Sequence, residues 1–262
     1  MKTADHILLT FRVSHYCEAA RFMLLHYGVP FREQSHYPLF SRLFTARYRG
    51  GSTPCLHAPE KNLTNTWSIF QYLESHYGDA KNSLLTNDSK TNEDIIDTAK
   101  SLFKRLGPAV RRCVYYPILV ERADGGVRWV QDCWRQETPL AERAAARLAG
   151  PLCEMFVRRG LNITSASTAR SQAIVNEIAM DMEARLADSE YLYADRFTIA
   201  DLALITMMAP YLIPGEYGRM LNPDSMPAAL RESIDQWRSS VLGKKLIAVY
   251  EKNRPAHEIY SV

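Results

Sequence analysis

The sequence predicts an α/β module followed by an all-helical region, and three observations carry this prediction. The first is a strand–helix–strand pattern over about residues 7–37, a length that suits two parallel strands joined by a helix. The second is a pair of short strands and a further helix over residues 53–78. The third is a polar segment over residues 79–91, beyond which the apolar residues keep helical spacing. We therefore expect one domain over about residues 1–80 and a helical domain over about residues 90–255.

The strand–helix–strand unit opens with a short apolar strand over residues 7–11. A helix is expected from about Cys17 to Tyr27, because its apolar residues recur at the i, i+3, i+4 and i+7 positions of an amphipathic helix. Gly28 follows at the position where helices end in a left-handed residue. The second strand is expected over residues 31–37.

A short connecting helix is expected over residues 38–49, with its apolar residues on one side. The next strand is expected to begin at Pro54, since proline cannot donate to a sheet ladder and belongs at a strand's first residue or edge. A helix then opens at Asn65–Thr66 and ends at Gly78. The free N–H groups at its start suit a carboxylate, so this stretch is a candidate peptide-binding site.

In the helical region, a first helix is expected to have its N-cap at Thr91 or Asn92. Gly107–Pro108 is expected to break or kink it, and Pro117 to bend the helix that follows. Pro151 suits the first turn of a later helix.

Three more helices are expected over about residues 168–186, 227–240 and 244–252. Between the first two of these, Thr198-Ile199-Ala200-Asp201 is an acidic variant of the capping box. In such a box the threonine caps the backbone at Asp201 while the carboxylate reaches back to Thr198.

The composition excludes several classes of protein. Hydrophobic residues make up 47% and charged residues 23% of the 262 residues, as in a soluble globular protein, and the net charge of +3 is too small to indicate nucleic acid as a partner. The pairs Arg111–Arg112 and Arg158–Arg159 are interpreted as solvated helix faces. No apolar run approaches the ~20 residues of a membrane span, and the N-terminus lacks signal-peptide anatomy, so a cytoplasmic protein is expected. The five widely spaced cysteines indicate neither a disulfide framework nor a metal site.

Four pieces of the sequence, in this order, resemble the cytosolic glutathione transferase superfamily. They are Ser14-His15-Tyr16-Cys17 at the place of the catalytic turn, Thr53-Pro54 at the place of the cis-proline, Asn65-Thr66-Trp67-Ser68-Ile69 at the start of a glutathione-binding helix, and Phe197-Thr198-Ile199-Ala200-Asp201-Leu202 at the family's capping box. The resemblance does not assign a class within the superfamily. It implies a thioredoxin-like N-terminal domain, a helical C-terminal domain and a homodimer that conjugates glutathione to a small, largely apolar electrophile in detoxification, without a metal.

The resemblance also implies a role for individual residues. The backbone of Thr53, before Pro54, would pair with the cysteinyl part of glutathione. Thr66 would hold the γ-glutamyl carboxylate, and Asn65 would bond the same end of the peptide. The glycine carboxylate needs a cation, for which the candidates are Arg42, Arg47 and Arg49.

The co-substrate is expected to lie between the catalytic turn and the first helices of the helical domain. The residues that fall there are Leu106, Val110, Cys113, Val114, Tyr115 and Tyr116, with Trp129 and Trp134 as further candidates.

Ser14 takes the catalytic position, which makes the turn serine-type. A free thiol has a pKa near ~8.5, and lowering it by about two units requires about 2.7 kcal/mol of preferential thiolate stabilisation. A helix terminus normally contributes only about 0.3–1 kcal/mol, whereas a hydrogen bond to a charged group adds about 1.5–3 kcal/mol. A hydroxyl that donates a hydrogen bond to the glutathione sulfur can therefore supply the stabilisation of the thiolate that the helix terminus alone does not.

Three alternatives remain open on the sequence. Ser14 can simply cap the following helix, with Tyr16 as a substitute hydroxyl donor. Ser-His-Tyr-Cys also has the spacing of the glutaredoxin Cys-Pro-Tyr-Cys turn, which would make Cys17 the thiol of a glutathione-dependent oxidoreductase or isomerase. Finally, His15 and Asn65 depart from the family pattern, as in a non-catalytic binding or scaffold protein that keeps the fold.

Overall fold

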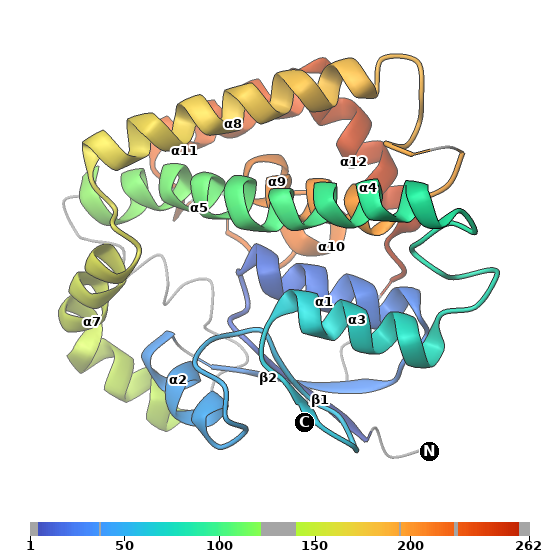
Figure 1. The fold of residues 1–262 in the computed structure, drawn as a ribbon. Coiled ribbons are helices and arrows are strands. Elements are labelled where there is room, and N and C mark those ends of the chain that lie inside the picture. The colour runs from blue at the N-terminus through green and yellow to red at the C-terminus, as the bar shows by residue number, and fades with distance from the viewer. Residues whose placement is uncertain (1–4, 37, 122–139, 194, 223–224, 257–262) are drawn as a thin grey trace.

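The computed structural model describes residues 5–36, 38–121, 140–193, 195–222 and 225–256 (Figure 1). Its single four-stranded sheet within these residues has the order β2-β1-β3-β4, with β1 parallel to β2 and antiparallel to β3, and β4 antiparallel to β3. The strands and helices of this module are β1 (His6–Thr10), α1 (His15–His26), β2 (Phe31–Ser35), α2 (Pro38–Ala46), β3 (Cys55–His57), β4 (Asn62–Leu63) and α3 (Thr66–Tyr77). The predicted order of elements and the thioredoxin-like fold are confirmed.

Helix α1 fits its sequence signals closely. It begins at His15, two residues before the predicted start, because Ser14 occupies the N-cap position. Gly28 has a φ of 64°, so the left-handed residue predicted after the helix is present.

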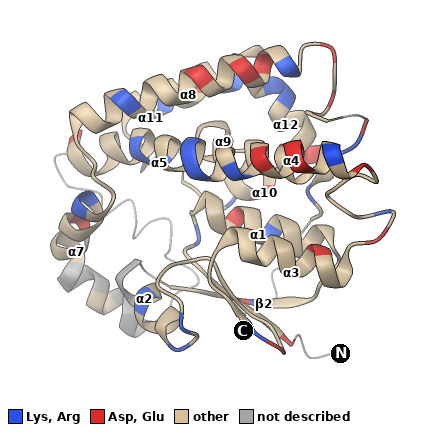
Figure 2. Ribbon diagram, viewed as in Figure 1, with Lys and Arg blue, Asp and Glu red and all other residues tan. Residues whose placement is uncertain are grey.

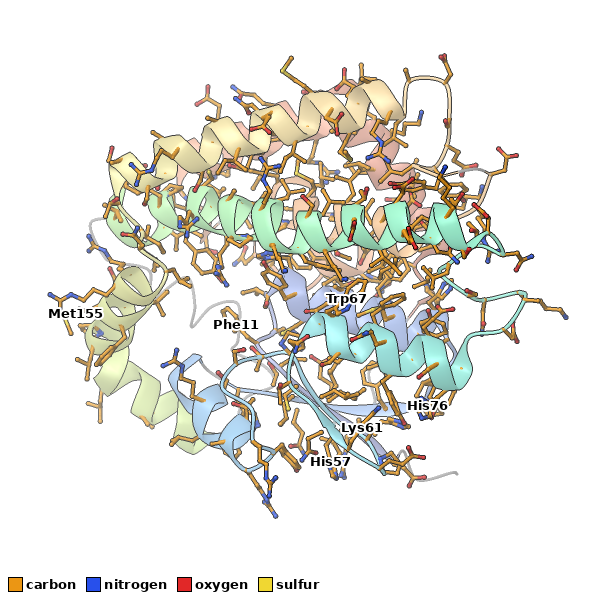
Figure 3. All side chains as sticks on the ribbon, viewed as in Figure 1. Phe11, His57, Lys61, Trp67, His76 and Met155 are labelled. Carbon is orange, nitrogen blue, oxygen red and sulfur yellow. The ribbon has the colours of Figure 1, made fainter. Side chains whose placement is uncertain are left out.

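The connecting helix α2 leaves part of its apolar surface in water. Leu43 is 70% and Phe44 39% exposed, and Phe44 stacks on His36 with ring centroids 3.8 Å apart. Helix α2 contacts α7, which carries further exposed apolar side chains, among them Met155 (Figure 3).

The first helices of the C-terminal region run on from one another (Figure 1). They are α4 (Ser89–Ser101), the π-helical segment η1 (Leu102–Leu106), α5 (Gly107–Tyr116) and the π-helical segment η2 (Pro117–Glu121). The predicted cap at Thr91 or Asn92 is wrong, since Asp88 caps α4 by accepting a bond from the Thr91 N–H at 2.8 Å.

The predicted break or kink at Gly107–Pro108 takes the form of the wider turn of η1. Gly107 has helical dihedrals and donates its N–H to the Leu102 carbonyl, one residue further back than in an α-helix. The Phe103 carbonyl therefore accepts no bond from the Gly107 N–H, and Pro108 has no N–H to donate to it. This carbonyl accepts a hydrogen bond from the Tyr16 hydroxyl, as described below.

The remaining helices are α7 (Leu140–Gly160), α8 (Ser165–Arg185), α9 (Ile199–Leu212), α10 (Gly215–Gly218), α11 (Ala228–Ser239) and α12 (Val241–Asn253). Pro151 lies inside α7 and not in the first turn of a helix as predicted. The helical backbone already begins at Leu140, and an interior proline is tolerated there at the loss of one backbone hydrogen bond. Among the helices of the described residues, none has both the length and the apolar character to cross a membrane.

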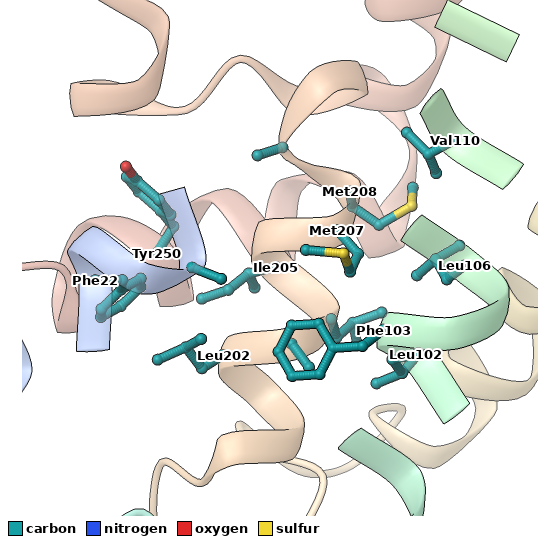
Figure 4. Packing of buried hydrophobic residues seen from close by; sticks show 14 of the residues in the cluster. Phe22, Leu102, Phe103, Leu106, Val110, Leu202, Ile205, Met207, Met208 and Tyr250 are labelled. Carbon is teal, nitrogen blue, oxygen red and sulfur yellow. The ribbon is translucent and has the colours of Figure 1, made fainter. Parts of the chain in front are cut away.

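Helix α9 lies at the centre of the core. All of its residues are buried, and Figure 4 shows Leu202, Ile205 and Met207 between Phe22 of α1 on one side and Phe103 and Leu106 on the other. A helix that is apolar on every face must be enclosed, so α9 packs against α1, α4, α5, α11 and α12.

The predicted capping box at the start of α9 is confirmed. One oxygen of the Asp201 carboxylate accepts from the Thr198 N–H at 2.9 Å and from its hydroxyl at 2.7 Å. The other oxygen accepts from the Leu192 N–H at 2.7 Å. The box thus also holds the loop before α9.

Replacing Asp201 by alanine is expected to lower the free energy of unfolding by about 1–3 kcal/mol, because it leaves buried N–H groups of Thr198 and Leu192 without partners. Urea unfolding of the purified protein measures this, with Asp88→Ala at the exposed cap of α4 as the matched control. An equal shift of the urea midpoint in the two variants would show that burial of the capping box adds nothing to the free energy of unfolding.

A buried network of charges joins α1 to the end of α12. One oxygen of Glu18 accepts from the Tyr250 hydroxyl and from Arg254 Nε, both at 2.8 Å. The other accepts from Arg21 at 3.3 Å, and Arg21 also pairs with Glu33 of β2 at 2.6 Å. Figure 2 accordingly shows both charge colours on α1, although this helix lies between the sheet and the C-terminal helices.

Candidate functional site

Ser14 lies in the turn between β1 and α1 and is half-buried. Its Oγ accepts a bond from the Cys17 N–H at 3.4 Å, so the capping role that the sequence left open is present. A hydroxyl has two acceptor lone pairs and one proton, and the cap uses only a lone pair. Capping is therefore compatible with donation of the Ser14 proton to a sulfur atom.

Cys17 is fully buried beneath this turn. Its sulfur accepts from the Phe11 N–H at 3.4 Å. Burial raises the pKa of the Cys17 thiol, against the opposing effects of Arg21 and of bonds that include the Ser14 and Thr53 hydroxyls. A reactive cysteine needs exposure and a lowered pKa, and Cys17 has neither.

His15 and Tyr16 attach the turn to the helical region. The Tyr16 hydroxyl donates to the Phe103 carbonyl at 2.7 Å, which is the carbonyl left open by η1. His15 Nε2 lies 3.2 Å from the Gly107 carbonyl, and the two rings lie 4.5 Å apart. Burial, and next the Arg111 charge, lower the pKa of His15 to about 3, so it is neutral and carries its proton on Nε2 toward that carbonyl. Burial raises the pKa of Tyr16 to about 12.

These bonds weaken the case for Tyr16 as a substitute donor. Its proton already points at a backbone carbonyl, and Arg111 lies over its ring at 5.8 Å. His15 and Tyr16 therefore position the turn that carries Ser14.

The predicted glutathione-binding residues lie at the start of β3 and of α3. The Thr53–Pro54 peptide bond is cis, and Thr53 is half-buried close to the Cys17 thiol. Asn65 caps α3 through its Oδ1, which accepts from the Ser68 N–H at 2.9 Å. Thr66 is only 6% exposed, so the helix start offers a carboxylate mainly its backbone N–H groups. The glutathione contacts of these residues stay predictions.

Next to Asn65 and Thr66, Trp67 fixes the start of α3 against the helical region. The Lys100 ammonium of α4 lies 5.0 Å from the centre of the Trp67 ring. Figure 3 shows Trp67 on α3. The three candidate cations for the glycine carboxylate, Arg42, Arg47 and Arg49, are all exposed on α2 and the turn after it, and their geometry does not separate them.

A small cavity of about 20 Å³ lies beside the Ser14 turn, which is room for about one water. Its walls include Val13, His15, Arg111, Val114, Tyr115 and Tyr217. Val13 and His15 flank Ser14 in the chain, so the cavity adjoins the candidate catalytic residue.

Only some of the residues predicted for the co-substrate pocket line this cavity, and their contacts with a co-substrate stay a prediction. Val114 and Tyr115 line it, but Val110 and Cys113 do not. Positions three apart share a helix face, so Val110 and Cys113 turn together toward the core, where the Cys113 thiol bonds the Thr168 carbonyl at 3.8 Å. Leu106 is fully buried in the same core, and Tyr116 is not part of the cavity wall. Trp129 and Trp134 lie outside the described residues.

Arg111 is the site residue that the sequence interpretation missed, since the Arg111–Arg112 pair was assigned to a solvated helix face. That assignment is wrong. Arg112 is half-buried and bonds the Leu161 carbonyl at 3.0 Å and Ser171 at 3.4 Å, and Arg111 faces the cavity. The spacing of Arg111 from Val114 and Tyr115, i, i+3 and i+4, was the signal that could have found it.

Comparison with known proteins supports the family resemblance. Residues 8–81 match the family model of the glutathione S-transferase N-terminal domain. No curated protein sequence matches the chain.

Several solved structures are similar over nearly the whole chain. A β-etherase from Sphingobium sp. strain SYK-6 is 17% identical with a TM-score of 0.58, over 94% of this chain and 99% of that one. A glutathione S-transferase from Methylobacterium radiotolerans, in complex with glutathione sulfonate, is 16% identical with a TM-score of 0.55, over 97% and 96%. A glutathione S-transferase from Methylobacillus flagellatus with glutathione bound is 15% identical with a TM-score of 0.54, over 92% and 98%. At these identities the similarity establishes the fold.

Proposed function

We propose that this chain, whose N-terminal module belongs to the glutathione S-transferase N-terminal domain family, binds glutathione and conjugates it through its sulfur atom to a small, largely apolar electrophile. The observation that carries the proposal is the Ser14 hydroxyl at the start of α1, which caps the helix with a lone pair, so that its proton can turn from the Cys17 sulfur to the thiolate of a bound glutathione. In this proposal residues 1–80 bind glutathione, residues 90–255 supply the co-substrate pocket, and the active form is a homodimer.

The proposed chemistry needs only glutathione and the electrophile. The thiol proton leaves to solvent, and the Ser14 O–H and the N-terminus of α1 stabilise the thiolate that remains. A sulfur lone pair then forms the bond to the electrophilic carbon, and the leaving group departs with the electron pair of the broken bond. Binding of both molecules side by side supplies the orientation.

Replacing Ser14 by alanine is expected to lower kcat/KM for conjugation about 10- to 100-fold, the range that corresponds to the loss of one hydrogen bond to a charged group. The pKa of bound glutathione, followed by the ultraviolet absorbance of its thiolate, is expected to rise by about one to two units. Cys17→Ser is the matched control and is expected to keep the wild-type pKa of bound glutathione.

A second variant separates donation from capping. Ser14→Asp keeps an N-cap acceptor but offers no proton and repels a thiolate, so it is expected to fold normally and to be at least as inactive as Ser14→Ala. Wild-type activity in Ser14→Asp would show that Ser14 acts only as a helix cap. Loss of activity only in Cys17→Ser would favour thiol exchange instead, and failure of the wild type to bind glutathione in calorimetry would overturn both.

A further inference from the structure

The Arg111 side chain brings a positive charge to the wall of the cavity beside Ser14. Its Nε is buried and has no hydrogen-bond partner, and none of the described residues forms an ion pair with it. The neighbouring Arg112 has two protein acceptors. Buried polar groups of folded proteins are nearly always paired, so Arg111 is an exception that requires an explanation.

Nothing in the described wall of the cavity compensates this charge. None of the described lining residues is acidic. His15 is neutral and directs its proton to a backbone carbonyl, and the hydroxyls of Tyr16 and Tyr217 donate to backbone carbonyls as well. The contact between Arg111 and the Tyr16 ring holds the guanidinium in place but leaves its N–H groups to bond an acceptor.

Most of the remaining wall is apolar and includes Val13, Val114, Pro210 and Leu230. The cavity has room for about one water, so a ligand would place only a small acceptor group against Arg111 and keep its apolar body outside the cavity. The planar guanidinium fork matches the two oxygens of a carboxylate, and a single cation among apolar residues offers too few donors for a phosphate.

We propose that Arg111 binds a carboxylate of the co-substrate, so that the electrophile is an apolar molecule carrying one carboxylate group. This inference rests on the proposed function and makes its substrate class narrower. Arg111 sets the specificity, and Ser14 acts on the glutathione sulfur.

The test compares a chlorodinitrobenzoate with its methyl ester as electrophiles, in the wild type, Arg111→Met, Arg111→Lys and Arg105→Met. Arg105 is the control, because it lies on the same continuous helix, is half exposed and pairs with Glu177 at the surface. The ratio of kcat/KM for the carboxylate over the ester is expected to fall about 10- to 100-fold in Arg111→Met, through KM. Arg111→Lys is expected to recover part of the ratio, and Arg105→Met to keep it.

A binding measurement separates this inference from the proposed function. Dinitrobenzoate without the leaving chlorine is titrated by calorimetry into the wild type and Arg111→Met in the presence of glutathione. Loss of dinitrobenzoate binding in Arg111→Met supports the carboxylate site. If neither electrophile is turned over, the transferase activity is rejected, but this binding result still supports the site. Equal binding in both proteins, or an unchanged ratio of carboxylate to ester, would overturn the inference.

Discussion

Replacing Glu18 by glutamine is expected to lower the free energy of unfolding by about 3–5 kcal/mol, the range for removing one partner of a buried ion pair. Glu18 is fully buried and bonds Arg21, Arg254 and Tyr250 at once. Without its charge the two guanidinium groups remain buried, and Glu33 is then their only carboxylate partner among the described residues. The urea midpoint is expected to fall while its slope m stays constant.

The exposed pair Glu190–Lys252 provides the control, since solvent screens it and Glu190→Gln is expected to change stability little. The double variant Glu18→Gln/Arg254→Gln is expected to be more stable than the sum of the two single effects predicts, because the charges are coupled. Additive effects, or a midpoint in Glu18→Gln equal to that of Glu190→Gln, would contradict a stabilising network.

The same network makes part of the stability depend on pH. Burial acts to raise the pKa of Glu18, but the charges of Arg254 and Arg21 outweigh it and hold this pKa below its ordinary value. Such a group contributes fully to stability above its pKa in the unfolded chain, about 4.3. This contribution is lost as the pH falls toward its lower pKa in the folded protein. The stability difference between the wild type and Glu18→Gln is therefore expected to be constant above about pH 5 and to narrow below about pH 4.

Replacing Gly107 by valine is expected to lower both stability and activity. A Cβ at Gly107 would lie 2.4 Å from the Tyr16 hydroxyl and 2.6 Å from the Met207 sulfur. Overpacking of this kind costs up to about 3 kcal/mol. Because Tyr16 positions the turn of Ser14, the conjugation rate is expected to fall about 100-fold, as for a catalytic group displaced by about 1 Å.

Gly160→Val is the control, since a Cβ there meets no atom within 4 Å. Tyr16→Phe, combined with Gly107→Val, removes the closest clash and is expected to recover part of the stability. Crystal structures of Gly107→Val and of the wild type measure the displacement of Ser14. An unmoved turn with normal kinetics would show that η1 does not position the site.

The fold could be predicted because its signals are local. Strand–helix–strand spacing, Gly28 after α1 and the Thr198–Asp201 box each depend on residues within a few positions of one another. The start of α4 was misplaced because Asp88, Thr91 and Asn92 all favour an N-cap and the sequence does not rank them.

The site was only partly predictable because it depends on contacts across the chain. Arg111 lines the cavity and Cys113 does not because of the face that α5 turns toward the Ser14 turn, and this face is set by the packing of α5 on α8 and α9. The Tyr16–Phe103 bond required the register shift of η1, for which Gly107–Pro108 was the only local sign. The pairing of Glu18 with Arg254 had no sequence signal, since 236 positions separate them.

That separation has a consequence for biosynthesis. Glu18 is translated well before its partners Tyr250 and Arg254, which lie 232 and 236 positions further along the chain. Until they emerge, the carboxylate of Glu18 has only Arg21, which Glu33 also engages. The buried charge network of α1 is therefore complete only after residue 254 has been translated, and a nascent chain that ends before this residue holds Glu18 without two of its native partners.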